Sequence, residues 1–462
     1  MVHQYKMGGY NIVMDINSGA LHVVDDITYD IISMYEEKSF DEIKAVIMEK
    51  YPDVSGEELD EIASELKELE ASGDLFSKDV YEDYILDFEN RPTVVKALCL
   101  HIAHDCNLAC RYCFADEGEY GDAGHKGLMS FEVGKKALDF LIANSGSRRN
   151  LEVDFFGGEP TLNFDVVKRL VEYGRSREEE CNKKFRFTLT TNGIRLDDEI
   201  QDFANKEMSN VVLSLDGRKE VNDHMRPFPG GKGSAYDIIV PKFQKLAESR
   251  GQMDYYVRGT FTHHNLDFSE DVLHMADLGF KQISVEPVVA PPEADYAIRP
   301  EDLPKLFSEY EKLALTMNER RQKGEGFNFF HFMIDLTGGP CVAKRLSGCG
   351  SGTEYLAVTP WGDLYPCHQF VGNKDFLLGN VDEGIKRTDI TGTFKKCNVY
   401  AKPKCRECFA RFYCSGGCAA NSYNFNGDIT SVYEIGCELE KKRVECAIYL
   451  KVAEEDRAEK ES

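Results

Sequence analysis

Residues 94–113 decide the fold of this chain, and they read Val-Val-Lys-Ala-Leu-Cys-Leu-His-Ile-Ala-His-Asp-Cys-Asn-Leu-Ala-Cys-Arg-Tyr-Cys. The nearly continuous apolar run 94–102 predicts a buried strand of a parallel sheet. Cys106, Cys110 and Cys113 follow this strand within one loop. Thiolates are the ligands of iron–sulfur clusters, and a fully ligated cubane cluster takes four of them. Three cysteines on one loop therefore predict a cluster with one iron left open for another ligand.

A structural zinc ion is the alternative occupant of this loop. Zinc takes four ligands in such sites, and His101 or His104 is close enough in the sequence to join the three cysteines. The spacing of the cysteines does not exclude zinc, so the motifs that flank the loop must separate the two interpretations.

Strands and helices alternate through residues 91–325, which we expect to form one domain. The predicted strands are 94–102, 151–156, 185–191, 211–216, 255–262 and 282–286, and the predicted helices include 131–143, 164–175, 270–278 and 304–323. Six βα-type units predict an α/β fold with a parallel sheet, either open or closed into a partial (β/α)6 barrel. In both architectures the active site lies at the carboxyl ends of the strands.

Short turns rich in glycine and polar residues follow the second, third and fourth predicted strands. They are Gly157-Gly158-Glu159-Pro160, Thr190-Thr191-Asn192-Gly193, and the stretch from Ser214 through Asp216 to Gly217. Glycines let the backbone approach a ligand closely, and a glutamate such as Glu159 can accept hydrogen bonds from an ammonium group. Each stretch is also an ordinary turn signal. Their shared position at strand ends favours a ligand site, for which Arg226 and Arg258 are further candidates; each could equally form a structural ion pair.

A second group of cysteines occurs in residues 326–462, which we expect to form a separate C-terminal domain. Its spacing is Cys349-x12-Gly362-x4-Cys367, then Cys405-x2-Cys408-x5-Cys414-x3-Cys418, and finally Cys437. The first ten residues do not resemble a signal peptide. In a chain that is not expected to be secreted, dense cysteine indicates metal ligation and not disulfides. We therefore expect a cytoplasmic protein in a reducing compartment.

The composition disfavours two classes of partner. The formal net charge is −25, which repels phosphate backbones and anionic lipid. No uninterrupted apolar stretch of about 18 residues occurs, so we expect no membrane-spanning helix. Neither nucleic acid nor a membrane is therefore an expected partner.

Residues 1–90 predict a small module of three strands followed by three helices, with a winged-helix-like shape. The third helix begins at Ser55 with a capping box to Glu58, and it ends at Gly73. Winged-helix modules often bind DNA, but this helix carries seven acidic residues and only one lysine. Residues 81–92 are acidic and end in proline, which predicts a linker to the next domain.

Both cysteine patterns resemble those of known families. The loop with Cys106, Cys110 and Cys113, and with Tyr112 before the last cysteine, is similar to that of the radical S-adenosylmethionine (SAM) superfamily. This resemblance implies that a [4Fe-4S] cluster binds the three thiolates, that its open iron chelates SAM, and that one-electron cleavage of SAM starts the reaction. The residues implied in SAM binding are Tyr112 and Phe114 near the adenine, Gly157, Gly158 and Glu159 at the methionine amino group, Thr191 and Asn192 near the ribose, and Ser214, Asp216 and Arg226.

The C-terminal pattern resembles the SPASM domain, which in its family carries two auxiliary clusters. By position, one [4Fe-4S] cluster would bind Cys405, Cys408, Cys414 and Cys437, and the other would bind Cys349, Cys367 and Cys418. Cys341 is a candidate for the missing ligand of the second cluster. Without it, one iron would be open to a substrate thiolate. A fully ligated pair of clusters that only carries electrons remains the alternative.

The order of the three domains resembles radical SAM peptide maturases. The stretches His3–Met7, Asn11–Val13 and Cys349–Gly352 are most similar to the maturases of SCIFF peptides, in the sactipeptide and ranthipeptide group. The resemblance implies an enzyme that forms thioether cross-links in a cysteine-rich precursor peptide. The leader of that peptide would add a strand to the sheet of the N-terminal module. An electron donor such as ferredoxin or flavodoxin is a further implied partner.

Two other functions remain open at this point. A related SPASM enzyme could oxidise a Cys or Ser side chain to formylglycine, although such a reaction gives no clear use for a leader-binding module. A winged-helix regulator that senses zinc or an iron–sulfur cluster belongs to a different class. The acidic third helix and the long α/β domain speak against that regulator.

Overall fold

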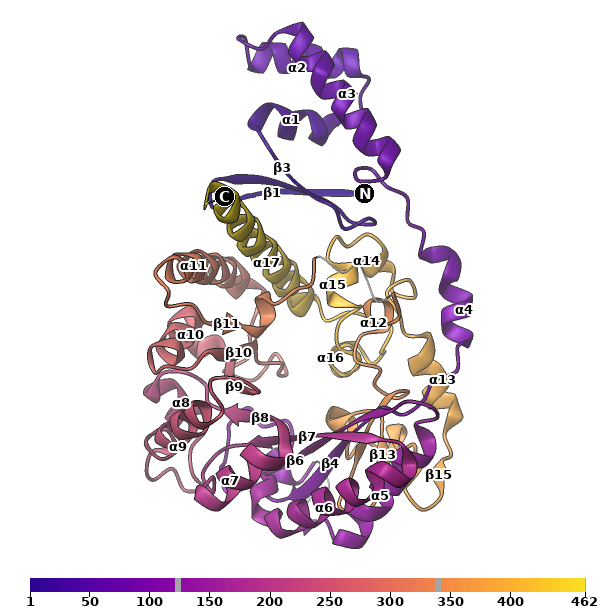
Figure 1. Ribbon diagram of the computed structural model, residues 1–462, viewed down its shortest axis with the longest axis vertical. Helices are drawn as coiled ribbons and strands as arrows, with labels where there is room; N and C mark the ends of the chain where they lie inside the picture. Colours follow the sequence, from indigo (N-terminus) through magenta and orange to yellow (C-terminus); the bar gives the residue numbers. More distant parts are fainter. Residues whose placement is uncertain (121–125, 337–341, 462) are drawn as a thin grey trace.

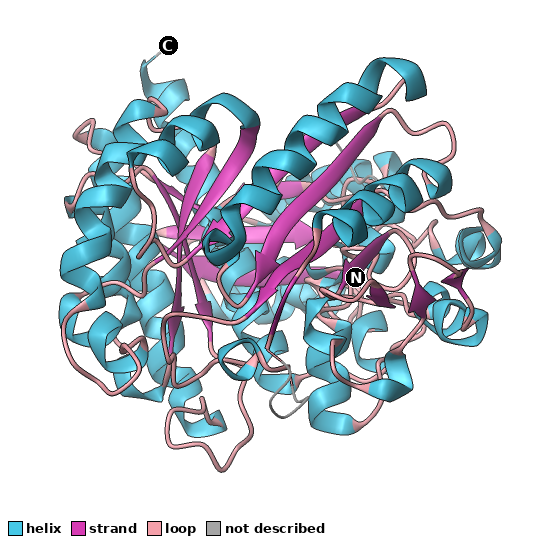
Figure 2. Cartoon of the chain, turned by 90° about the horizontal axis from the view of Figure 1, so that it is seen from below, coloured by secondary structure: helices cyan, strands magenta, loops and turns pink. Residues whose placement is uncertain are grey.

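Six parallel strands form the centre of the structure and curve into part of a barrel. The computed structural model describes residues 1–120, 126–336 and 342–461. In spatial order the six strands are β4 (Ala97–His104), β6 (Asn150–Gly157), β7 (Lys184–Thr191), β8 (Met208–Ser214), β9 (Tyr255–Phe261) and β10 (Gln282–Pro287). Helices cover the outer face of this sheet (Figure 2). The structure thus has the predicted parallel α/β arrangement, and the sheet is curved.

The alternation of side chains along the strands explains why one face of the sheet is apolar and the other is polar. On β7, Phe185, Phe187 and Leu189 are buried, whereas Arg186 and Thr188 between them are more exposed. Successive side chains of a strand point to opposite faces. The buried phenylalanines therefore pack under the helices, and the polar set faces the interior of the barrel.

The helices of this domain follow the predicted pattern, with one difference. They are α5 (Phe131–Asn144), α6 (Phe164–Cys181), α7 (Asp198–Glu207), α8 (Lys219–Met225), α9 (Ala235–Ser249), α10 (Phe268–Asp277) and α11 (Leu303–Gln322). Helix α6 was predicted to end at Arg175 but continues for six residues. No glycine or proline interrupts it there, and it ends only at Asn182, whose φ of 52° is left-handed.

The cysteine-rich C-terminal region extends the barrel sheet, which the sequence did not predict. Strand β12 (Tyr355–Val358) pairs in parallel with β4 at the barrel edge, and β13 (Asp363–Tyr365), β14 (Gly379–Asn380) and β15 (Gly384–Ile385) continue the sheet antiparallel. At the opposite edge, β11 (Asn328–Phe329) pairs with β10. These strands have four residues or fewer, too few for a pattern of alternation to be read from the sequence.

Short helices follow one another through the C-terminal region, and one long helix closes it. The helices are α12 (Val342–Ser347), α13 (Thr388–Lys396), α14 (Pro403–Arg406), α15 (Arg411–Cys414), α16 (Ala419–Asn426) and α17 (Glu434–Glu461). Helix α17 lies beside α11 (Figure 1), with Tyr310 and Val444 among the buried residues there. Cys437 lies in the first turn of α17, so the same helix supplies a cysteine and closes the core.

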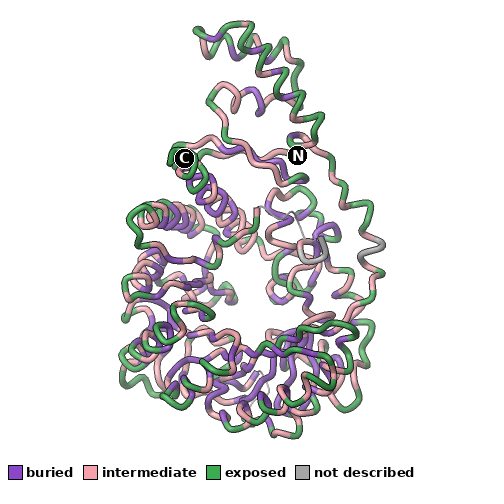
Figure 3. The backbone as a smooth tube through the Cα atoms, viewed as in Figure 1, coloured by how far each residue is buried: buried purple, intermediate pink, exposed green. Residues whose placement is uncertain are grey.

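The N-terminal module stands apart from the barrel, at the top of Figure 1. Its strands β1 (Val2–Met7), β2 (Tyr10–Asp15) and β3 (Leu21–Val24) form an antiparallel sheet in that order, followed by α1 (Asp26–Met34), α2 (Phe40–Lys50) and α3 (Gly56–Ser72). Ser55 caps α3 with the expected box to Glu58, and Gly73 ends it at φ 82°. A separate small core, which includes Ile31, Ile47, Leu59 and Leu66, holds the helices on the sheet. Figure 3 shows how much of this module is exposed.

Residues 81–92, predicted as a linker, contain helical structure. They form a 3-10 helix η1 (Glu82–Tyr84) and helix α4 (Ile85–Asn90). Glu82 forms an ion pair with Arg406, and Glu89 accepts a hydrogen bond from Asn398 at 3.0 Å. The acidic residues that suggested a solvated linker thus bind basic and polar side chains of the C-terminal region.

The module is joined to the C-terminal region through a shared core. The His3 ring stacks on Phe409 with ring centres 3.5 Å apart, and Ile16 packs in one apolar cluster with Cys405 and Phe412. Buried Arg411 donates to Asn17 at 2.5 Å and to Asp79 at 2.9 Å. The N-terminal sheet therefore rests directly on the segment that carries the auxiliary cysteines. In the part of the chain that the structure describes, no helix has the length and apolar character needed to cross a membrane.

Candidate active site

The loop that carries Cys106, Cys110 and Cys113 is fixed from two sides. It leaves the carboxyl end of β4, and the backbone N–H groups of Ala109 and Arg111 donate to the carbonyls of Pro227 and Met225, at 2.8 and 2.9 Å. On its other side, the carbonyl of Asp105 accepts from the N–H of Glu159 at 2.9 Å. The cysteines are therefore held between the turn after β6 and the segment after α8.

The carboxylate of Glu159 joins two of the strand-end turns. Its Oε1 accepts from the hydroxyls of Thr161 and Thr191 at 2.6 and 2.8 Å, and its Oε2 accepts from the N–H of Asn192 at 2.7 Å. Glu159 is fully buried. Burial raises the pKa of this carboxyl above its ordinary value, while the hydrogen bonds from Thr161, Asn192 and Thr191 act in the opposite direction. The side chain that was expected to hold a ligand amine is engaged with the protein itself.

Asn192 connects the second turn to the cysteine loop. Its Nδ2 donates to Asn107 Oδ1 at 2.8 Å and lies 3.6 Å from the sulfur of Cys106. Thr191 is buried and its hydroxyl also accepts from the N–H of Gly193 at 3.1 Å. The structure thus brings both predicted turns and the first cysteine together at one edge of the sheet.

A second buried network lies on the other side of the loop. The Tyr112 hydroxyl is 2.7 and 2.9 Å from the two oxygens of Asp216, and Arg226 Nη1 donates to that hydroxyl at 2.9 Å. Asp216 also accepts from the N–H of Thr260 at 3.0 Å. Arg226 is 8% exposed, and among the described residues its Nε has no hydrogen-bond partner. A buried guanidinium with an unpartnered N–H suits an anionic group such as a carboxylate.

Phe114 and Ser214 lie outside this network. Phe114 is 52% exposed, and its ring is 5.4 Å from that of His368 and 6.1 Å from that of Tyr120. Tyr112 and Phe114, both expected near one adenine, therefore contact different neighbours in this structure. Ser214 ends β8 beside Arg258 of β9.

Arg258 forms an ion pair in the barrel interior. Its Nη2 is 3.0 Å from Glu286 Oε2, and both side chains are partly exposed. Burial opposes ionisation of Glu286, but Arg258, His331 and Arg443 together lower its pKa to about 2. The pair leaves Glu286 ionised and the charge of Arg258 compensated.

Seven of the C-terminal cysteines fall into two groups in the structure. Cys405, Cys408, Cys414 and Cys437 line one cavity of about 130 Å³. Cys349, Cys367 and Cys418 lie near one another, and the charges of Cys418 and Cys349 contribute to the raised pKa of Cys367. Cys341, the candidate for a further ligand, lies outside the residues that the structure describes.

The thiols of the cysteine loop are spaced more widely than the ligands of a single metal ion. Burial raises the pKa of Cys106 to about 12, of Cys110 to about 11 and of Cys437 to about 11, so these thiols are protonated at neutral pH and must lose their protons for a metal to bind. Within residues 1–120, 126–336 and 342–461, no three Cys, His, Asp or Glu side chains are placed to hold one metal ion. The thiolates of a cluster each bind a different iron and so stand farther apart than zinc ligands do.

The zinc alternative is weakened further by the two histidines that it requires. His101 Nδ1 and His104 Nε2 lie 3.0 Å apart and share a hydrogen bond. Both rings are buried, and both contact Tyr120. The hydrogen bond between the two rings and their contacts with Tyr120 give both histidines a role inside the protein.

Comparison with known proteins identifies the central domain. Residues 100–249 match the family model of the "Radical SAM superfamily". These residues are similar to a radical SAM domain. They contain most of β4, the cysteine loop, the turns after β6 and β7, and the Tyr112–Asp216–Arg226 network.

Three similar proteins extend the likeness beyond this domain. A cysteine-type anaerobic sulfatase-maturating enzyme of Clostridium novyi is 24% identical over 339 residues, which cover 69% of this chain and 86% of that protein. The solved structure of anSMEcpe with bound AdoMet has a TM-score of 0.65 at 21% identity, over 78% of this chain and 96% of that one. SuiB of Streptococcus suis with S-adenosylmethionine has a TM-score of 0.54 at 16% identity, over 94% and 98% of the two chains.

Sequence reasoning missed several residues that shape the radical SAM site and its surroundings. Asn107 lies between two cysteines and was assigned no role, although it accepts from Asn192. His368 follows Cys367 directly and contacts Phe114, but only the paired strands β4 and β12 bring it there. Sequence spacing carries no signal for either contact.

Gly158 gives a test of how the radical SAM loop is held. A Cβ on Gly158 would lie 2.1 Å from the carbonyl oxygen of Asp105, so Gly158→Ala must push the cysteine loop out of place. We expect SAM affinity to fall about tenfold or more, with less iron bound per chain. Both are measured on anaerobically reconstituted protein.

Gly392→Ala is the matched control for this substitution. Gly392 lies in α13, and a Cβ added there would have nothing within 4 Å, so its variant should match the wild type. Wild-type iron content and SAM affinity in Gly158→Ala would contradict the role assigned to the turn.

Proposed function

We propose that this protein is a radical SAM maturase that forms thioether cross-links between Cys thiols and carbon atoms of acceptor residues in a leader-bearing, cysteine-rich peptide. The observation that supports this most directly is the presence of three separate cysteine sets around one barrel, at the Cys106 loop, around the 130 Å³ cavity, and at Cys349, Cys367 and Cys418. The first set would hold the SAM-binding [4Fe-4S] cluster, and the other two would hold auxiliary [4Fe-4S] clusters.

Thioether formation is an oxidation of the peptide. One C–H bond and one S–H bond break, one C–S bond forms, and two protons and two electrons leave the peptide for each cross-link. When bound, SAM and the iron–sulfur clusters would supply the one-electron chemistry that accepts these electrons. An external carrier such as ferredoxin or flavodoxin would exchange electrons with the protein.

The residues of this chain would position SAM. The fit of Arg226 to a carboxylate supports contact with the methionine carboxylate, because its Nε has no partner among the described residues. Glu159 would act through its neighbours, since its oxygens bind Thr161, Thr191 and Asn192. The main-chain oxygens of Gly157 and Gly158 would then be the acceptors for the methionine ammonium group.

The N-terminal module offers a site for the leader peptide. Strand β3 is an edge of its sheet, so one row of its backbone groups is open to pairing with another strand. A cavity of about 330 Å³ runs between β3 and helices α1 and α3. Its lining is mostly apolar and includes Leu21, Val23, Ile62, Leu66 and Leu69. A leader that adds a strand to β3 would place apolar side chains in this cavity.

The charge of α3 favours a leader with basic residues. Glu65 lies in the lining of the cavity, and Glu61 and Glu68 are exposed on the same helix. The module as a whole belongs to a chain with a net charge of −25. A basic residue beside the apolar anchors would meet opposite charge at the rim of the cavity.

Formylglycine formation is the second candidate, since a sulfatase-maturating enzyme is among the similar proteins. One difference favours the leader-guided function. The likeness to anSMEcpe covers 78% of this chain, whereas that to SuiB covers 94%. SuiB has also been solved with its precursor peptide SuiA. The additional coverage, about 74 residues, is close to the size of the N-terminal module.

The mass of the product distinguishes these two functions. Reconstituted protein, reductant, SAM and a cysteine-rich peptide with a leader should yield a peptide lighter by two hydrogen atoms per cross-link, with one thiol fewer for alkylation. Formylglycine formation would instead convert a Cys or Ser side chain into an aldehyde that reacts with a hydrazide probe. An aldehyde product with all other thiols intact would contradict the proposed thioether chemistry.

Val23 provides a test of the leader site. It is 51% exposed on the edge strand β3 that lines the cavity, so Val23→Asp should lower leader affinity about tenfold by placing a charge beside the added strand. Fluorescence anisotropy of a labelled leader measures this effect. Val46→Asp is the matched control, because Val46 is 39% exposed on α2 and outside the cavity. Equal leader affinity in both variants would place the leader elsewhere.

A further inference from the structure

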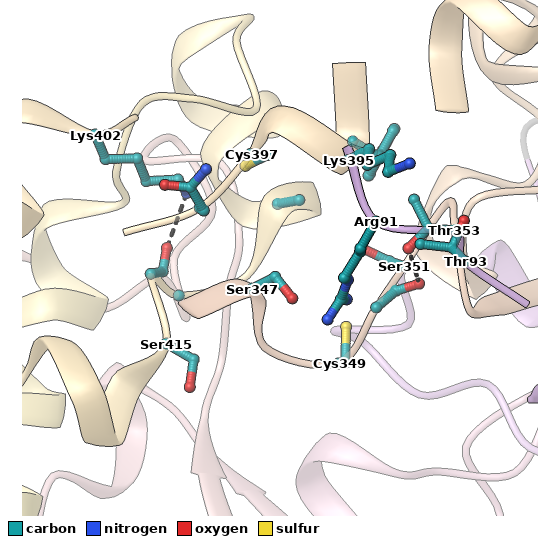
Figure 4. Close-up of a pocket in the computed structure, with 16 residues that line it drawn as sticks. Arg91, Thr93, Ser347, Cys349, Ser351, Thr353, Lys395, Cys397, Lys402 and Ser415 are labelled. Atoms are coloured by element: carbon teal, nitrogen blue, oxygen red, sulfur yellow. Dashed lines mark hydrogen bonds between the residues drawn. The ribbon is translucent and has the colours of Figure 1, made fainter. Parts of the chain in front are cut away.

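Lys402 is a buried cation beside the auxiliary cysteines. It is 2% exposed, and its Nζ donates to the carbonyl of Gly416 at 2.8 Å. The thiol of Cys397 is a second hydrogen-bond neighbour of this ammonium group. Figure 4 shows Lys402 and Cys397 on one side of the pocket and Cys349 on the opposite side.

The ammonium group has no carboxylate partner among the described residues. No Asp or Glu oxygen of residues 1–120, 126–336 or 342–461 forms an ion pair with it, and Asp428 acts on it only from a greater distance. Lys183 is also buried, but it donates to two main-chain carbonyls at 2.6 and 2.8 Å. Burial of a charge with so little compensation destabilises the protein. A negative group near Lys402 would remove that cost.

The position of Lys402 points to the four-cysteine cavity. The carbonyl of Lys402 accepts from the N–H of Cys405 at 2.9 Å, and its ammonium is the largest influence that lowers the pKa of the Cys405 thiol against burial. Gly416, which accepts from the ammonium, lines this cavity and also the pocket of Cys349 and Cys397. The residue that binds the ammonium therefore lines the four-cysteine cavity, and Lys402 itself lines the neighbouring pocket of Cys349.

We propose that Lys402 compensates the negative charge of the auxiliary cluster held by Cys405, Cys408, Cys414 and Cys437, and thereby raises the reduction potential of that cluster. This inference rests on the proposed function, because it requires a cluster at these cysteines. Lys402 would act through its positive charge and would not ligate iron. Net charge, hydrogen bonds to sulfur and solvent exposure set the potentials of such clusters, and a buried cation stabilises the more negative, reduced state.

Lys404 is a matched control in the same short helix. It also lines the four-cysteine cavity, but its side chain is 66% exposed and pairs with Glu434. Water and the carboxylate screen its charge. A comparison of Lys402→Met with Lys404→Met therefore separates the effect of a buried charge from the effect of an exposed charge close to the same cysteines.

The test is a redox titration of the full-length protein, followed by electron paramagnetic resonance. A background with Cys106, Cys110 and Cys113 replaced by Ala removes the SAM-binding cluster, so that only auxiliary clusters are observed. Lys402→Met and Lys402→Gln should each lower one auxiliary potential by a tenfold or larger change in the reduction equilibrium, about 59 mV for one electron. Lys402→Arg and Lys404→Met should keep the potential of the background protein.

Each outcome decides the proposal. An unchanged potential in Lys402→Gln at full iron content would overturn it. Failure of Lys402→Met and Lys402→Gln to take up iron supports it if Lys402→Arg takes up the full amount, since charge is then required for cluster binding. Failure of Lys402→Arg as well indicates a packing role and overturns it. A background protein that lacks auxiliary iron altogether refutes the proposed function itself, which iron analysis detects before any titration.

Discussion

The buried carboxylate of Glu159 is the interaction on which the rest of the site depends. It receives hydrogen bonds from the turn after β6 and from the turn after β7, while the N–H of the same residue binds the cysteine loop after β4. A buried carboxylate is stable only where such donors surround it. The ends of β4, β6 and β7 are therefore fixed relative to one another. This fixes the cysteine loop at the same edge of the sheet. The glycines before Glu159 allow the close backbone approach that this arrangement needs.

The second constraint is the continuity between the domains. Strand β12 joins the barrel sheet at β4, and Arg411 joins the N-terminal module to the loop between Cys408 and Cys414. Removal of the module would therefore expose Phe409 and leave buried Arg411 without Asp79. A truncated protein would lose part of the scaffold around the C-terminal cysteines as well as the proposed leader site. Point substitutions in the groove of β3 and α3 are for this reason more informative than deletion.

Much of the fold was predictable because long elements have regular patterns. The alternation in β7 and the capping box of α3 were visible in the sequence, and the structure has both. The short strands β12 to β15 and helix α4 were missed, because so few residues give no period and their stability comes from contacts distant in the sequence.

The candidate site was predictable to a similar extent. Cysteine spacing predicted which thiols gather, but it gave no information on the neighbours that orient them. The internal use of the Glu159 carboxylate and the burial of Lys402 depend on tertiary packing, which determines whether a polar side chain meets a ligand or another part of the protein. Cys397 shows the same limit. It belongs to neither cysteine pattern of the sequence, yet it donates to the carbonyl of Ile429 at 3.2 Å beside Lys402.

The most direct measurement for the central claim is an anaerobic one. The protein is reconstituted, iron, sulfide and zinc are counted, and 5′-deoxyadenosine is assayed after addition of a strong reductant and SAM. About twelve irons per chain, as three four-iron clusters require, together with 5′-deoxyadenosine that disappears in Cys110→Ala, are the result that this account predicts. Zinc in place of iron, or formation of 5′-deoxyadenosine at an undiminished rate in Cys110→Ala, would contradict it.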